Sequence, residues 1–152
     1  MTTHEKEAAR LFRSGYNCAQ AVFCAFAGDI GMDIDTAARL SSSFGGGMGR
    51  MREVCGAVSG ALMALGAIKG YDDVSDISLK KAHYEKVQLI MKGFQEELSS
   101  YICRDIIKVL GAQEPSPTPR TEEFYKVRPC EKCVRCAARL MDTQILGLTD
   151  EE

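Results

Sequence analysis

The residues best able to do chemistry in this chain are its cysteines. The sequence has 152 residues, of which seven are cysteines and none is tryptophan. An odd number of cysteines cannot pair completely within one chain. In a reducing compartment, cysteines more often bind metals or take part in catalysis than form structural disulfides. The seven positions are Cys18, Cys24, Cys55, Cys103, Cys130, Cys133 and Cys136.

The rest of the composition predicts a cytoplasmic protein. The first residues, MTTHEKEAARLFRSG, are polar and charged and lack the apolar stretch of a signal peptide. The longest apolar run, residues 54–68, has 15 residues and is broken by three glycines and a serine, whereas a membrane-spanning helix needs about 20 apolar residues. We therefore expect no membrane insertion. The formal net charge of −2 also argues against nucleic acid as a partner.

Four cysteines from distant segments coincide with predicted helix starts. Cys18 follows a capping asparagine, Cys103 lies three residues after a capping serine, Cys130 follows a proline, and Cys55 opens the apolar run. A helix N-terminus carries about half a positive charge and free N–H groups. This environment lowers the pKa of a thiol and favours the thiolate, which is the form that reacts or binds metal. It also suits an anionic iron–sulfur cluster, whose sulfurs accept hydrogen bonds.

The other three cysteines require different interpretations. Cys24 lies six residues after Cys18, about 240° around a helix, so we expect it to pack in the core. The string CEKCVRC, residues 130–136, begins like a bacterial ferredoxin ligand run but lacks its fourth cysteine and proline. Such C-x-x-C pairs also suit zinc or a thiol–disulfide centre. On a continuous helix Cys130 and Cys136 point apart, and we expect Cys133 and Cys136 to be exposed.

Residues beside the cysteines give weaker signals. We expect His4 to be solvated and His83 to be a partly buried, hydrogen-bonded packing residue, so cysteine–histidine catalysis has little support. The glycine-rich residues 45–49 match neither the phosphate-loop nor the dinucleotide signature and predict a tight turn packed on the core. Basic residues are no more frequent beside the four cysteines than in the whole chain. Local charge therefore does not mark the site.

Helical periodicity predicts the elements that must position these cysteines. A first apolar stripe ends near Gly15, and a later one starts at Asp33 or Asp35 with Leu40 among its inward-facing residues. Steps of three and four between apolar residues are typical of amphipathic helices. The further helices expected from this pattern cover residues 17 to about 28, 76 or 78 to about 98, 100–110, and the segment after Pro129.

The segment from about 54 to 69 predicts the centre of the fold. It is apolar nearly all round, which is typical of a buried helix, and small residues recur at Gly56, Gly60 and Ala64. Three prolines mark an extended connector over about 112–120. No segment shows strict alternation of polar and apolar residues. The sequence therefore predicts an all-α fold: one domain, residues 1–152, with a multi-helix bundle around a buried Gly/Ala-rich central helix.

Several motifs together resemble a known family. They are GYNCAQAV, SFGGGMG, CGAVSGALMALG, a cysteine ahead of Leu-Gly, and a cysteine ahead of V-x-x-A-A. In this order they are similar to the C_GCAxxG_C_C family over roughly residues 11–146. The resemblance implies a redox-active protein. It also implies a functional set of four cysteines, with Cys133 and Cys136 as substitutes for the last of them: Cys18, Cys55, Cys103 and Cys130.

Three functions remain open from the sequence. The first is electron transfer or redox sensing, with the four thiolates binding an iron–sulfur cluster, for which a two-iron form is favoured. Family-like domains that carry such a cluster imply this function. The second is metal-free thiol–disulfide chemistry, for example between Cys130 and Cys133. The third is a non-catalytic helical domain whose cysteines bind structural zinc or pack. The sequence identifies neither an enzyme activity nor the redox protein partner, and it allows a homodimer without requiring one.

Overall fold

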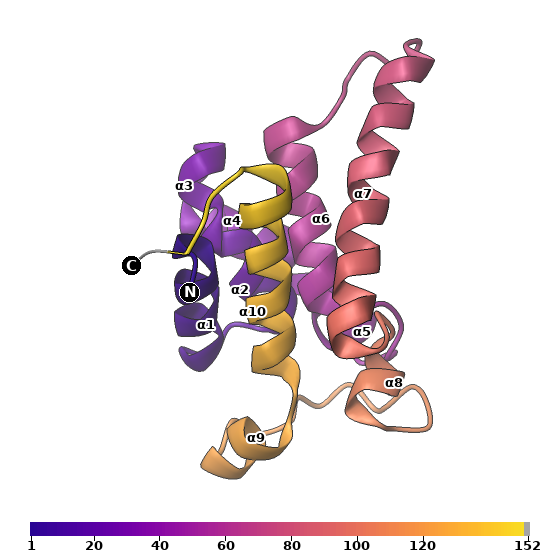
Figure 1. Ribbon diagram of the computed structural model, residues 1–152. Helices are drawn as coiled ribbons and strands as arrows, with labels where there is room; N and C mark the ends of the chain where they lie inside the picture. The colour runs from indigo at the N-terminus through magenta and orange to yellow at the C-terminus, as the bar shows by residue number, and fades with distance from the viewer. Residues whose placement is uncertain (151–152) are drawn as a thin grey trace.

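Helices form the whole framework of residues 1–150, which the computed structural model describes (Figure 1). No β-strand lies within these residues, so the predicted all-α fold is confirmed. In chain order the elements are α1 (Thr3–Arg13), α2 (Cys18–Ala25), α3 (Ala27–Ile30), α4 (Ile34–Ser41), η1 (Ser42–Phe44), α5 (Gly45–Met48), α6 (Gly56–Lys69), α7 (Ile77–Leu98), α8 (Cys103–Ile107), α9 (Glu122–Val127), α10 (Cys130–Leu140) and η2 (Met141–Ile145).

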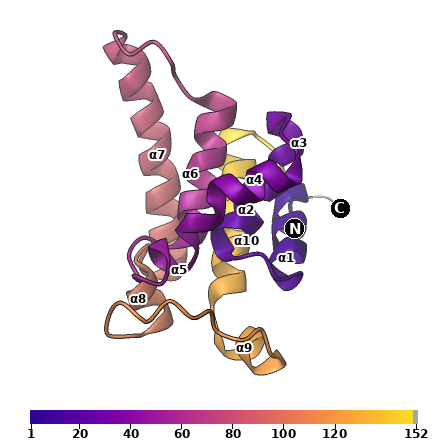
Figure 2. The ribbon, with the colours of Figure 1, turned by 180° about the vertical axis from the view of Figure 1, so that it is seen from behind.

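Helix α6 lies at the centre of the bundle, as the sequence predicts. It packs against α2, α10 and α7, which surround it in both views (Figures 1 and 2). Its Ala57, Ala61 and Ala64 are completely buried. Gly60 faces α2 so closely that a Cβ there would lie 2.5 Å from the carbonyl oxygen of Ala19. The small residues of α6 therefore let the neighbouring backbones approach it.

The amino-terminal helices begin where the capping residues predict. The side chain of Asn17 accepts a hydrogen bond from the backbone N–H of Gln20 at the start of α2, and Asp33 caps α4 in the same way. The expected inward position of Leu40 is wrong, because this side chain is 52% exposed. Helix α4 instead buries Ala37 and Ser41, which are four residues apart and share a face.

The segment after α7 differs most from the prediction. A helix was expected over residues 100–110, but α8 covers only Cys103–Ile107. Val54 and Ile102 form an isolated antiparallel β-bridge, so residue 102 is extended and cannot be helical. The hydroxyl of Ser100 accepts a hydrogen bond from the N–H of Ile102 within this turn. The connector over about 112–120 has no helix, as predicted.

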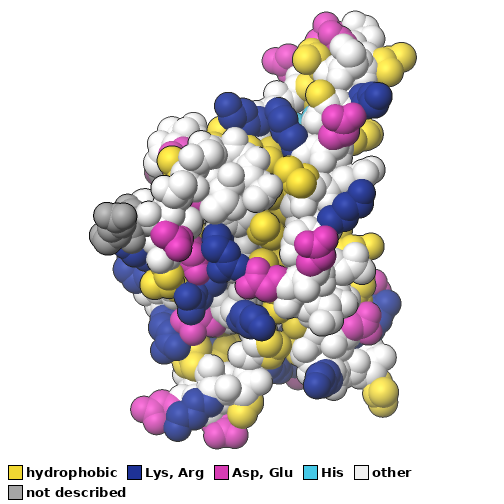
Figure 3. Space-filling model, viewed as in Figure 1, with side chains coloured by type: hydrophobic (Ala, Val, Ile, Leu, Met, Phe, Trp, Pro, Cys, Tyr) yellow, Lys and Arg dark blue, Asp and Glu magenta, His cyan; other side chains and the backbone are white. Residues whose placement is uncertain are grey.

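Helix α10 completes the bundle and is continuous from Cys130. It buries Val134, Ala137 and Ala138 and passes into the single π-helical turn η2. Charged side chains of both signs are spread over the face seen in Figure 3. Within the described residues, no helix has the length and apolarity that a membrane crossing requires.

Candidate functional site

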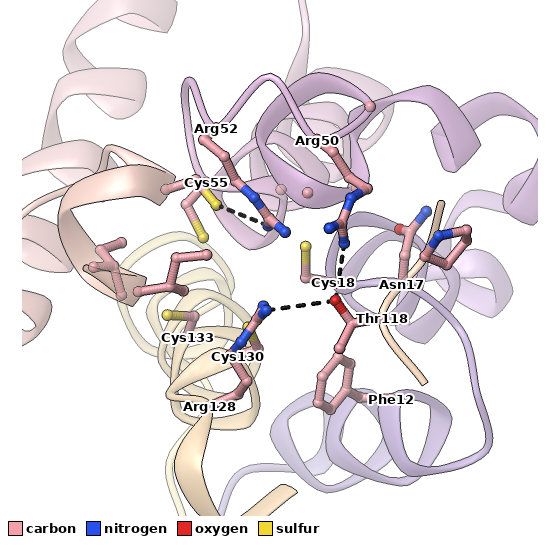
Figure 4. Close-up of a pocket in the computed structure, with 18 of the residues that line it drawn as sticks. Phe12, Asn17, Cys18, Arg50, Arg52, Cys55, Thr118, Arg128, Cys130 and Cys133 are labelled. Atoms are coloured by element: carbon pink, nitrogen blue, oxygen red, sulfur yellow. Dashed lines mark hydrogen bonds between the residues drawn. The ribbon is translucent and has the colours of Figure 1, made fainter. Parts of the chain in front are cut away.

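Five cysteines, four of them at helix starts, line one cavity of about 360 Å³ (Figure 4). Cys18 is the first residue of α2, Cys55 is the cap of α6, Cys103 opens α8 and Cys130 opens α10. The prediction that these residues stand at four helix starts is confirmed. The fold therefore brings together the complete set that the sequence singled out. Their action as ligands stays a prediction.

The β-bridge between residues 54 and 102 sets Cys55 and Cys103 side by side. The N–H of Cys55 donates to the carbonyl oxygen of Tyr101 at 2.8 Å, and the N–H of Cys103 donates to the carbonyl oxygen of Glu53 at 2.6 Å. These two hydrogen bonds fix the backbones that carry both thiols. The shortening of α8 is thus the local feature that places Cys103 in the cavity.

Two glycines let the backbone approach the cysteines closely. A Cβ at Gly56 would overlap the sulfur of Cys18, and a Cβ at Gly47 would lie 2.7 Å from the Cβ of Cys103. Gly47 also has a φ of +64°, in the left-handed region that disfavours a side chain. Glycine at both positions is therefore a requirement of the site.

The glycine-rich turn continues into an unusual backbone. The predicted tight turn consists of the short elements η1 and α5, with Gly46 and Gly47 in left-handed conformations. Arg50 and Arg52 also have positive φ values, 70° and 59°. Left-handed non-glycine residues cost energy and persist where the surrounding structure holds them. This conformation carries both arginine side chains to the wall of the cavity.

The remaining cysteines separate into two groups. Cys133 is 2% exposed, lines the same cavity and hydrogen-bonds the thiol of Cys55. Cys136 is completely buried outside the cavity and donates to Oε2 of Glu97 at 3.1 Å. The expected exposure of Cys133 and Cys136 is wrong, because α2, α6 and α7 cover α10. Cys24 is buried in the apolar core, which confirms its predicted packing role.

The thiols of Cys18, Cys55 and Cys130 have raised pKa values, which favours their neutral form. Burial and the proximity of Cys55 raise the pKa of Cys18 to about 12. Burial, together with Cys18 and Cys55, likewise raises the pKa of Cys130 to about 12. The hydrogen bond with Cys133 and burial raise the pKa of Cys55 well above 9.0. The expectation that helix starts favour thiolates is therefore wrong for the metal-free protein, since burial outweighs the backbone N–H groups.

Cys103 differs from the others because it contacts a cation. Burial raises the pKa of its thiol, but the hydrogen bond and positive charge of Arg52 oppose this shift. Nη1 of Arg52 donates to the sulfur of Cys103 at 3.5 Å, while its Nε donates to Oε1 of Gln113 at 2.9 Å. Arg52 is buried, with only 3% of its surface exposed.

Four arginines line the cavity, and sequence reasoning did not identify them as a group. They are Arg50, Arg52, Arg120 and Arg128. Across residues 1–150, no carboxylate forms an ion pair with any of the four. The count of basic residues beside each cysteine included Arg52 and Arg128 but showed no enrichment, because Arg50 and Arg120 lie farther from the cysteines along the chain. Of the other basic neighbours, Arg104 pairs with Glu53 and Lys132 lies in a different groove.

The two histidines lie away from this cavity. The expectation that His4 is solvated is wrong, because its ring is buried against Phe26 between two carboxylates. Burial by itself lowers the pKa of His4, but hydrogen bonds and charges of Asp142 and Asp29 raise it overall. His83 contacts the ring of Tyr71 edge-on, but its buried Nδ1 has no hydrogen-bond partner within the described residues. It is a packing residue without the expected hydrogen bond at that atom.

The cysteines surround the cavity and do not meet at one point. Among residues 1–150, no three or more histidine, cysteine or acidic side chains form a ready-made site for a metal ion. The cavity walls also include apolar groups, among them Phe12, Ile106 and Pro117. The site therefore combines sulfur donors, cationic side chains and apolar surface around one cavity.

Comparison with known proteins agrees with this set of residues. A family model described as "Putative redox-active protein (C_GCAxxG_C_C)" matches residues 16–144. This match includes all seven cysteines and confirms the resemblance seen in the motifs. Neither the curated proteins nor the solved structures include a significant match to the chain.

Proposed function

Because the chain belongs to the C_GCAxxG_C_C family of redox-active proteins, we propose that four of its five cavity cysteines bind an iron–sulfur cluster. The proposed role is electron transfer or redox sensing, with a two-iron cluster favoured. The single observation that carries this proposal is the position of Cys18, Cys55, Cys103 and Cys130 around one cavity. Thiolates are the usual ligands of such clusters.

The surroundings of the sulfurs fit an anionic group. The backbone N–H groups of Gly46 and Ala19 hydrogen-bond the sulfur of Cys18, and those of Ala57 and Val58 hydrogen-bond that of Cys55. Arg52 donates to the sulfur of Cys103. Hydrogen bonds to cluster sulfurs and a positive environment stabilise added negative charge and tune the reduction potential. This donor set therefore supports a redox group in the cavity.

The chain's own residues have defined tasks in this proposal. Cys18, Cys55 and Cys130 are protonated in the metal-free protein and release their protons when they bind iron, since thiolate is the ligating form. The Arg52 guanidinium supplies a fixed positive charge beside Cys103. When bound, the cluster supplies one-electron oxidation and reduction.

A second candidate is metal-free thiol–disulfide chemistry, and one contact favours it. The thiols of Cys55 and Cys133 are within hydrogen-bonding distance of each other. Exchange of this pair with the disulfide of a partner would form one S–S bond here and transfer two electrons and two protons to the partner, whose disulfide becomes two thiols. However, the raised pKa of Cys55 opposes nucleophilic attack at neutral pH, because the thiolate is the nucleophile. We therefore rank this function below cluster binding.

Anaerobic preparation separates the two functions. The protein is purified without oxygen, its visible spectrum is recorded, and iron, sulfide and zinc are assayed per chain. We expect broad absorbance above about 400 nm, bound iron and sulfide, and bleaching on reduction. A colourless, metal-free protein, even after reconstitution with iron and sulfide, would overturn cluster binding. Reversible loss of two titratable thiols in that colourless protein would instead support the second function.

A further inference from the structure

Two arginines of the cavity, Arg50 and Arg128, share a neutral hydrogen-bond partner. Arg50 and Arg128 reach the hydroxyl of Thr118 from opposite sides of the cavity (Figure 4). Nη1 of Arg50 lies 2.9 Å from Thr118 Oγ1, and Nη2 of Arg128 lies 3.5 Å from it. The neutral hydroxyl oxygen of Thr118 thus accepts hydrogen bonds from two guanidinium groups. Thr118 adds no negative charge between them, because its hydroxyl does not ionise at physiological pH.

The two arginines differ from Arg120, the other cation on this wall. Arg120 donates to the carbonyl oxygens of Phe12 and Tyr16 and lies over the ring of Phe12 at 4.3 Å. These contacts give Arg120 a structural role. Arg50, by contrast, donates to only one carbonyl oxygen, that of Glu114. Arg128 contacts Thr118 and the ring of Phe124. Both therefore retain N–H donors for a ligand.

The space beside these arginines has the character of a small-molecule site. Its volume of about 360 Å³ falls within the range of about 300–1,000 Å³ typical of such sites. The apolar walls formed by Phe12, Ile106 and Pro117 would contact a carbon skeleton. Guanidinium groups bind phosphate and carboxylate oxygens through paired N–H donors.

From these observations we infer that the cavity also binds a small organic anion, with its phosphate or carboxylate between Arg50 and Arg128. The anion would lie beside the cysteines and against the apolar wall. This inference deepens the proposed redox function by giving the class of molecule that reaches the site. The binding itself does not depend on a cluster, so the two proposals can fail separately.

Calorimetric titration with three probes tests the inference at constant ionic strength in chloride. The probes are inorganic phosphate, phenyl phosphate and benzoate, each titrated into metal-free and iron-loaded protein. We expect phenyl phosphate to bind more tightly than inorganic phosphate, because the ring would contact the apolar wall. Comparison of phenyl phosphate with benzoate distinguishes a phosphate site from a carboxylate site.

Three variants locate the binding. Arg50→Gln and Arg128→Gln should each weaken binding at least about tenfold, since each removes a charged hydrogen-bond donor. Arg10→Gln removes a surface arginine paired with Glu7 and should leave binding unchanged. Circular dichroism of each variant checks that the helices form. Because Arg128 is only partly buried, its loss leaves the fold testable if Arg50→Gln does not fold.

Each combination of results decides the matter. Arginine-dependent binding to iron-loaded protein supports the inference. If no cluster forms, the same binding to metal-free protein supports it while the proposed function fails. Binding to metal-free protein that disappears on iron loading overturns it, because the arginines would then serve the cluster alone. Absence of binding to either form, or equal binding by all variants, also overturns it.

Discussion

Two polar regions of this protein differ in whether their charged side chains form ion pairs. Near the chain ends, the His4 ring lies between Asp142 and Asp29, with Nδ1 2.5 Å from Asp142 and Nε2 2.6 Å from Asp29. Beside it, buried Glu5 pairs with Arg135 and Arg139. The cysteine cavity instead gathers four arginines that lack carboxylate partners among residues 1–150.

This difference shows which region pairs its charges within the chain and which region has charges available for a ligand. Buried charges are costly unless they are paired, and the region around His4 satisfies this requirement within the chain. Of the four arginines in the cysteine cavity, Arg52 is buried and the other three are partly exposed, and bound negative charge would pair with them there. Cysteine thiolates on a cluster, together with an organic anion, would provide that charge. The comparison therefore assigns stability to the first region and binding to the second.

Removing Asp142 should have the largest effect on stability. Asp142 is completely buried and holds both the ring and the backbone N–H of His4. Asp142→Ala should lower the free energy of unfolding by about 3–5 kcal/mol, because it leaves His4 without its buried partner. Urea denaturation measures this loss. The control is Asp150→Ala, which removes a surface contact to the amino terminus and should cost under about 1 kcal/mol. Equal losses in both variants would contradict the assignment.

Two glycine replacements within α6 should act in opposite directions. Gly56→Ala places a Cβ against the sulfur of Cys18 and should destabilise the fold by about 1–3 kcal/mol. Gly66 is exposed in the same helix and has open space around it, so Gly66→Ala should stabilise by about 0.5–1 kcal/mol. Thermal unfolding compares the two variants. A stabilising Gly56→Ala would mean that the close approach at the cysteines is absent.

The two regions should lose stability in different pH ranges in the metal-free protein. The folded pKa of His4 is raised above 6.5, so its contribution is complete below pH 6.5 and is lost as pH rises through the folded value. The pKa values of Cys18 and Cys130 rise from 9.0 to about 12, so their contribution is lost only above pH 9.0.

Urea denaturation across this pH range tests both assignments. Each buried thiol should remove about 1.4 kcal/mol per pH unit above its unfolded pKa. His4→Gln should abolish the first decline and Cys18→Ala should reduce the second. If Cys18→Ala left the alkaline decline unchanged, the thiols would not be its source.

Arg52→Gln should give the smallest structural change and a specific redox effect. The substitution removes a positive charge beside Cys103 while glutamine can still donate a hydrogen bond. Loss of positive charge near an iron–sulfur cluster stabilises its oxidised form, so the reduction potential should fall. Redox titration of the loaded protein measures the shift, with Arg10→Gln as the control. An unchanged potential in Arg52→Gln would show that this arginine does not act on the cluster.

The sequence predicted the placement of the cysteines better than their chemistry. The caps Asn17 and Asp76 and the small residues of α6 act locally, so their patterns were sufficient to locate helices. The extent of α8 depends on the bridge from Val54 to Ile102, a long-range contact that periodicity does not report. Periodicity likewise missed the burial of Cys133.

The charge state of the site also depends on tertiary structure. Helix starts favour thiolates, but burial reverses the effect at Cys18. Arg50 and Arg52 are near neighbours in the chain, but only the folded chain places them beside Arg120 and Arg128. His4 lies near the amino terminus in sequence, yet its backbone N–H donates a hydrogen bond to Asp142, 138 residues away.

The most direct test of the account is the sulfide content of anaerobically reconstituted single Cys→Ser variants. We predict that Cys18→Ser, Cys55→Ser and Cys103→Ser lose bound sulfide and visible absorbance, while Cys24→Ser and Cys136→Ser retain both. Comparison of Cys130→Ser with Cys133→Ser identifies the fourth ligand, which we predict to be Cys130. Circular dichroism confirms that each variant is helical. Full sulfide content in folded Cys18→Ser, Cys55→Ser and Cys103→Ser would contradict a cluster in this cavity.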